Sequence, residues 1–125
     1  MNFKVTLIWP LLMLALFGCS IAGIVHPRID IEFENQSSND MENTSVHFGK
    51  FECRVGALAR TALAGYGDFP HPITANTEVH WDVRGTHHME KLDLDKIFEK
   101  GKGGTLMFTI TDQGVKVDFN RKRVP

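Results

Sequence analysis

Three of the chain's six histidines flank one predicted turn, the pair Arg84-Gly85. They are His80, His87 and His88. Asp82 shares the parity of His80 in an alternating segment, so an antiparallel hairpin would bring imidazoles and a carboxylate within reach of one cation. His71, which stands between two prolines, is a more remote candidate for the same cluster. Such a cluster could bind a metal ion or support metal-dependent hydrolysis.

Solvated side chains at an exposed hairpin end are the alternative interpretation of this cluster. Recognisable metal-binding spacings, such as HExxH or paired CxxC, do not occur in the sequence. The sequence therefore predicts no bound metal and no cofactor. Metal binding by the histidine cluster remains the alternative prediction. Its four candidate ligands are His80, Asp82, His87 and His88.

Catalytic patterns of other kinds have less support. A serine nucleophile on an elbow would require a GxSxG motif, which the sequence lacks. Cys53 alternates with apolar residues and is predicted to face the core as a small buried hydrophobe. The Gly-Lys-Gly-Gly segment at 101–104 lacks the spacing of a phosphate-binding loop. We expect a protein that is not an enzyme, and we identify no small-molecule substrate.

The N-terminal sequence carries a pattern that indicates where in the cell the protein is located. Residues 5–17 form an apolar run that is too short to cross a bilayer, and residues 1–18 have the layout of a secretory signal. The run ends in Leu16-Phe17-Gly18-Cys19, which resembles the lipobox of bacterial lipoproteins. The resemblance implies cleavage before Cys19 and attachment of lipid to that residue. Because Ser20 rather than Asp follows, it also implies sorting to the outer membrane of the cell envelope, facing the periplasm.

Four parts follow from this interpretation: a lipoprotein signal peptide at 1–18, a membrane tether at 19–27, a folded domain at 28–120 and a basic tail at 121–125. A formal net charge of −1 argues against a nucleic-acid partner, since neutralising phosphates requires a clustered excess of Lys and Arg. The tail either touches anionic lipid head groups or is solvated. The expected partners are the membrane, through the lipid anchor, and an envelope protein.

Alternating apolar residues predict strands along most of the folded part. They occur at 28–34, 78–84, 86–94, 106–110 and 115–119. Trp81 is the expected centre of the core, because aromatic rings bury the most area. Pairing Trp81 with Met89 while keeping Leu92 inside would require a bulge in the return strand.

Two further segments are less regular. The parity of the apolar residues changes at Gly49-Lys50, so 46–55 is interpreted as one strand whose β-bulge keeps these side chains on one face. Residues 57–64 form either a helical turn or a loop with a short strand. The Pro-rich stretch up to Asn76 is expected to cross between two sheets.

These segments amount to five to seven short strands without a strong amphipathic helix. The pattern predicts an all-β fold, a small antiparallel sandwich with at most one short helix, for which an immunoglobulin-like arrangement is one form. An open sheet packed by one short helix is the alternative fold. On such a scaffold we expect a partner to bind at an edge strand or at the loops, which here are 35–45, 65–76 and 84–88.

The expected function is a non-enzymatic envelope lipoprotein with a binding or structural role. An immunity or inhibitor protein would have the same sequence features. The alternative function is the binding of a metal, or metal-dependent hydrolysis, by His80, His87 and His88.

Overall fold

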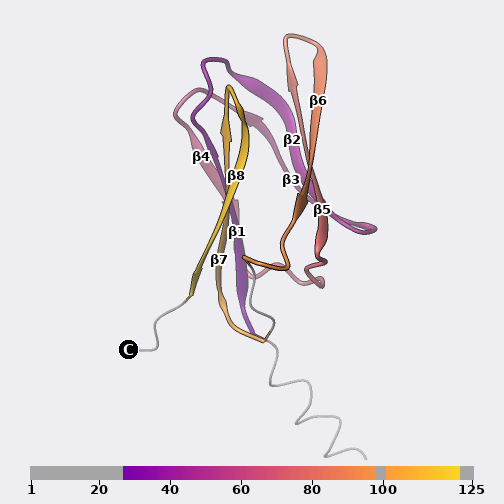
Figure 1. Ribbon diagram of the computed structural model, residues 1–125. Coiled ribbons are helices and arrows are strands. Elements are labelled where there is room, and N and C mark those ends of the chain that lie inside the picture. Colours follow the sequence, from indigo (N-terminus) through magenta and orange to yellow (C-terminus); the bar gives the residue numbers. More distant parts are fainter. Residues whose placement is uncertain (1–26, 98–100, 122–125) are drawn as a thin grey trace, which may run out of the picture.

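The computed structural model describes residues 27–97 and 101–121 (Figure 1). Eight strands in these residues form two four-stranded sheets that pack face to face. The described ranges contain no helix, and accordingly none that is long and apolar enough to cross a membrane. The predicted all-β sandwich is confirmed, with more strands than the five to seven expected.

The first sheet has the strand order β4-β1-β7-β8. Its strands are β4 (Leu63–Tyr66), β1 (Ile29–Asn35), β7 (Gly104–Thr111) and β8 (Gly114–Arg121). β1 and β7 pair in parallel, whereas the other two pairs are antiparallel. The sheet is therefore mixed, and this one parallel pair departs from the predicted antiparallel arrangement. The reason lies in the connections: β1 leaves for the second sheet and β7 returns from it, so both strands enter the first sheet at the same end.

The second sheet has the order β3-β2-β5-β6 and is antiparallel throughout. Its strands are β3 (Phe51–Leu58), β2 (Met41–Phe48), β5 (Asn76–Val83) and β6 (Thr86–Asp93). The segment predicted as one bulged strand is two strands joined by a tight turn, in which Gly49 has a positive φ of 61°. Phe48 and Phe51 pair across this turn, so the apolar residues on its two sides do share one face.

Two connections settle what the sequence left open. Residues 67–75 lead from β4 in the first sheet to β5 in the second, which confirms the predicted crossover. Residues 57–64 hold the end of β3, a turn and the start of β4, so the helical alternative is wrong. The candidate loop at 35–45 is shorter than expected, because β2 already begins at Met41.

Phenylalanines from both sheets form the centre of the core. Phe33 and Phe108 of the first sheet stack with ring centroids 5.4 Å apart, and Phe48 of the second lies 6.3 Å from Phe108. All three are buried, and each buried side chain of this size contributes roughly 1.5–3 kcal/mol. Trp81, the predicted centre, is only half-buried. It lies near the end of β5 and stacks on His88, away from the phenylalanines.

β5 and β6 pair in one continuous register. Trp81 pairs with His88 instead of Met89, while Leu92 pairs with Thr77 on the inner face. Met89 consequently faces outward and is 44% exposed. The return strand therefore needs no bulge to keep Leu92 inside.

The turns that follow β1, β3, β5 and β7 gather at one end of the sandwich, opposite the end where the chain enters β1 (Figure 1). We call this the distal end; its turns are 36–40, 59–62, 84–85 and 112–113. Hydrogen bonds tie the turn at 36–40 to the turn at 112–113, since the N–H and the hydroxyl of Ser38 each donate to Asp112 Oδ1 over 2.9 Å. These two turns are therefore held in place relative to each other.

Candidate functional site

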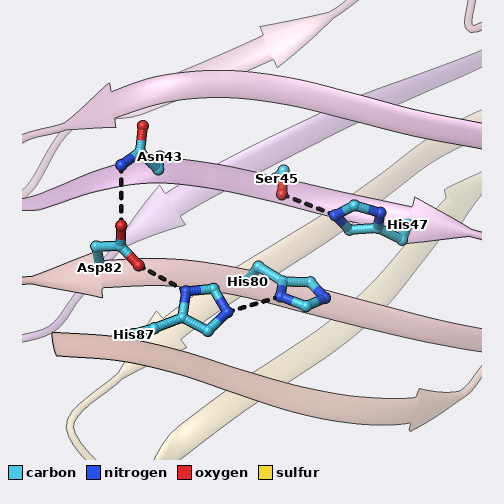
Figure 2. Close-up of polar contacts among 6 residues, drawn as sticks. All are labelled: Asn43, Ser45, His47, His80, Asp82 and His87. Atoms are coloured by element: carbon cyan, nitrogen blue, oxygen red, sulfur yellow. Dashed lines mark hydrogen bonds and ion pairs between the residues drawn. The ribbon is translucent and has the colours of Figure 1, made fainter.

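Polar residues on the outer face of the second sheet form a connected group, which we call the outer-face network (Figure 2). Its members are Asn43, Ser45 and His47 of β2, Glu78, His80 and Asp82 of β5, and His87 of β6, and Figure 2 draws all of them except Glu78. Successive residues of a strand point to opposite faces, so their neighbours, such as Val46 and Val79, are buried in the core. The alternation that builds the core therefore also gathers these polar side chains outside it.

His80 and His87 lie at the centre of the network and contact each other directly. His80 Nδ1 is 2.9 Å from His87 Nε2. Their remaining nitrogens each meet a carboxylate: His87 Nδ1 lies 2.6 Å from Asp82 Oδ1, and His80 Nε2 lies 3.1 Å from Glu78 Oε1. A chain of groups thus runs from one carboxylate through two imidazoles to the other.

Counting hydrogen-bond donors shows which protons this chain of groups requires. Carboxylates only accept, so the nitrogens that face Asp82 and Glu78 must both carry a proton. The contact between the rings needs one further proton, held by either His80 or His87. Forming all three contacts as hydrogen bonds at once would thus require three protons on the two rings.

Asp82 is also held from its other side by Asn43, whose Nδ2 donates to Asp82 Oδ2 over 2.9 Å. The hydrogen bond from Asn43, followed by that from His87, keeps the pKa of Asp82 below its ordinary value. Asn43 reaches the carboxylate because β2 carries an extra residue there relative to β5, and Asn43 itself adopts a φ of 51°. Asparagine tolerates this left-handed conformation better than most residues.

His47 joins the network through ring packing. Its ring meets that of His80 edge to face with centroids 4.5 Å apart, and its Nε2 lies 3.2 Å from Ser45 Oγ. Sequence reasoning missed both His47 and Asn43. His47 has the same outward parity in β2 that His80 has in β5, but no local pattern reveals that these two strands are neighbours.

Two predicted members of the histidine cluster lie elsewhere. His88 follows His87 in β6 but points to the inner side, where its ring stacks on Trp81 with centroids 5.6 Å apart. His71 stacks on Phe51 at 4.1 Å. The predicted set of four ligands is therefore divided between the two faces of the sheet. Within the part of the chain that the structure describes, no group of three or more His, Cys, Asp or Glu side chains could hold a metal ion.

A second feature lies at the distal end, where a cleft of about 420 Å³ opens beside the β5-β6 hairpin. It is lined by Ser37, Asn39, Trp81, Val83, Arg84, His88, Met89, Glu90, Thr111, Asp112 and Gly114. The stacked rings of Trp81 and His88 form an aromatic part of this lining. Glu90 accepts a hydrogen bond from the Val115 N–H over 3.0 Å and so ties β6 to β8. We call this feature the distal cleft.

The thiol of Cys53 is buried among core residues, which confirms its predicted inward orientation. Burial raises the pKa of this thiol to about 11, so it stays protonated near neutral pH. The other cysteine, Cys19, is the predicted site of lipidation and lies outside the described residues.

Comparison with known proteins bears on the fold. No family model and no curated protein matches the chain. Among solved structures, the NMR structure of a protein from Eubacterium rectale is similar, with 14% sequence identity and a TM-score of 0.51. The similarity covers 78% of this chain and 93% of that one. A likeness at this level of identity concerns the fold alone and does not indicate a function.

Proposed function

We propose that the protein is a lipid-anchored binding module of the bacterial cell envelope, without enzymatic activity, that holds a partner protein at its distal end. The observation that carries this proposal is the distal cleft, with its stacked pair Trp81 and His88 and its pre-formed turns.

The lipid anchor is inferred from the resemblance of residues 16–19 to a lipobox. Acyl chains on Cys19 would hold the protein at a membrane, because each buried CH₂ contributes about 0.8 kcal/mol and several chains act together. The described chain enters β1 at the end of the sandwich opposite the distal turns. A partner at the distal cleft would therefore be bound on the side away from the lipid.

The lining of the distal cleft suits a protein partner. Tryptophan and arginine are among the residue types that dominate binding energy at interfaces, and here Trp81 and Arg84 both line the cleft. Two of the distal turns, 36–40 and 112–113, are held together by the hydrogen bonds from Ser38 to Asp112. Fixed turns lower the entropic cost of binding, so more of the contact energy is available for affinity.

Arg84 has a strained backbone conformation. Its φ is 49° in the two-residue turn between Val83 and Thr86, and Gly85 follows with a φ of 78°. Two-residue turns with positive φ at both positions favour asparagine first, and a left-handed residue other than glycine costs roughly 1–2 kcal/mol. Strain of this kind clusters at functional sites, which supports Arg84 as a contact for the partner.

A matched pair of proteins tests the partner-binding proposal. The full chain carrying Cys19→Ala is cross-linked in an envelope extract of the producing bacterium, beside the same chain with Arg84→Asn added. Asparagine suits the turn, so the second protein keeps its fold and loses only the guanidinium. We expect a discrete partner whose yield falls about tenfold with Arg84→Asn. Equal yields from the two proteins, or no captured partner, would refute the proposal.

The anchor is tested separately by metabolic labelling with palmitate. Wild-type protein should incorporate the label, and Cys19→Ser should not. Labelled Cys19→Ser protein, or a mature wild-type product that retains residues 1–18, would contradict a lipid attached at Cys19.

A further inference from the structure

The strand β8 forms one edge of the first sheet, and within the described residues no strand pairs with its outer side. It is eight residues long, compared with four for β4 at the opposite edge of the sheet. An edge strand presents a row of backbone N–H and C=O groups with which another strand can pair. β8 is therefore the longer of the two edges at which a further strand could extend this sheet.

The backbone groups of every second residue in β8 point to this outer edge, because those of the residues between them point to β7. The Val115 N–H donates to Glu90 of β6, and the Phe119 N–H donates to the carboxylate of the adjacent Asp118, each over 3.0 Å. Both contacts lie outside the β7-β8 ladder, so the odd-numbered residues face the edge. Val117 lies midway between these two residues, and its outward N–H and C=O have no hydrogen-bond partner among the described residues.

Two opposite charges flank Val117 on the solvent side of the strand. The side chains that carry them, Lys116 and Asp118, are both exposed. Their cross-strand neighbours in β7 are Thr109 and Met107, which carry no charge. In the part of the chain that the structure describes, Lys116 forms no ion pair. The two charges are therefore not neutralised within the first sheet.

A second copy of β8 matches this pattern in one antiparallel register. With a two-fold axis at Val117, the two Val117 residues exchange backbone hydrogen bonds, and Lys116 of each copy lies opposite Asp118 of the other. Opposite charges in this position stabilise a strand pair, whereas like charges destabilise it. A shift of the axis by one residue, to position 116 or 118, would place Lys116 or Asp118 opposite its own copy. The charges thus select the register centred on Val117.

We propose that the protein forms a symmetric homodimer in which the β8 strands of two copies pair antiparallel about Val117. The pairing joins the two four-stranded first sheets into one continuous sheet. It is short, and Glu90 already holds the Val115 N–H at one end of it, so the dimer is weak in solution and favoured where copies are held close together. Val117 and its flanking charges do not line the distal cleft, so the dimer goes beyond the proposed partner binding.

Exchange of the two charges tests the dimer by sedimentation equilibrium at about 0.1 mM protein. Four full-chain proteins, all carrying Cys19→Ala, are compared in a non-ionic detergent: the parent, Lys116→Asp, Asp118→Lys and the double variant with both changes. The parent should dimerise. Each single variant should raise the dissociation constant about tenfold, since like charges then face each other twice in the dimer. The double variant restores opposite charges and should dimerise like the parent.

The double variant is also the control for association elsewhere on the chain. The N-terminal residues are the same in all four proteins, so association through them would not follow the pattern of charges at positions 116 and 118. Circular dichroism of each variant shows that it is folded. A parent that stays monomeric would overturn the proposal, as would equal dissociation constants in all four proteins or a double variant that dimerises as weakly as the single variants.

Discussion

The inner and outer faces of the second sheet are built by the same strands, yet they differ in almost every physical property. Inward side chains such as Phe48, Val46 and Val79 are fully buried and pack against the first sheet. Outward side chains such as His80 and His87 contact one another and remain accessible to solvent. Strand alternation alone therefore separates the side chains that stabilise the fold from those that could carry chemistry.

The neighbours His87 and His88 show this separation most sharply. One ring is part of the outer-face network, and the next stacks on Trp81 at the distal cleft. Because the side-chain period of a strand is two residues, a shift of the β5-β6 pairing by a single residue would exchange their roles. The register of this hairpin therefore determines on which face of the sheet each of the two histidines lies.

The largest expected contrast between the faces is in stability. Phe48→Ala removes a ring that contacts Phe69 and Phe108, and should lower the free energy of unfolding by about 3–5 kcal/mol. His47→Ala, at the preceding outward position, should lower it by less than about 1 kcal/mol. Urea denaturation of both variants measures the contrast. Equal losses would show that the outer-face network carries as much stability as the core.

The next largest expected difference is in the rate at which the buried thiol of Cys53 is alkylated. Cys53 is 2% exposed and burial raises its pKa to about 11, compared with about 8.5 for a free thiol. At pH 8 its thiolate fraction is lower by roughly two orders of magnitude, so alkylation by iodoacetamide in the Cys19→Ala chain should be at least about a hundredfold slower than in urea. Comparable rates would mean that the inner face opens readily to solvent.

One residue on the inner face breaks the rule that buried polar groups are paired. Among the described residues, Thr44 is fully buried and its Oγ1 has no hydrogen-bond partner. Thr44→Val replaces this hydroxyl with a methyl group of similar shape and should stabilise the fold by about 1 kcal/mol. Thermal unfolding measures the change, with Ser45→Ala as the comparison, because the hydroxyl of Ser45 is also buried but contacts His47 Nε2. A lower melting temperature for Thr44→Val would indicate that the hydroxyl has a partner after all.

The smallest expected effect concerns pH at the exposed distal turns. The backbone N–H and then the hydroxyl of Ser38 lower the pKa of Asp112 below its ordinary value of 3.8. A lowered folded-state pKa stabilises the fold above the ordinary value, and this contribution disappears as pH falls through the folded-state pKa. The stability advantage of wild type over Asp112→Asn should be constant from pH 5 to pH 8 and shrink below about pH 4. An advantage that grows on acidification would contradict the assigned contact.

Local alternation was enough to predict the strands and much of the core. It placed Ile31, Phe33 and Val79 inside, because apolar periodicity follows directly from burial on one face. It did not give strand order or direction, and the parallel pairing of β1 with β7 depends on connections across the whole chain. The Gly49-Lys50 turn was interpreted as a bulge because both devices leave the same residues on one face.

The candidate site was predictable only in part, for the same reason. Local sequence placed Asp82 and His80 on the outward side of one strand and His87 near them. It could not separate His87 from His88 without the register of the hairpin, nor bring in His47 from a strand that becomes a neighbour only in the fold. The outer-face network thus needed the tertiary structure.

The β5-β6 register brings His80 and His87 together on the outer face of the second sheet and puts His88 against Trp81 on the opposite face. Proton NMR of the imidazole and indole side chains tests this directly through nuclear Overhauser effects. The structure predicts contacts between the rings of His80 and His87 and between those of His88 and Trp81. Contacts between His87 and Trp81, with His88 near His80, would contradict the register and every functional inference drawn from it.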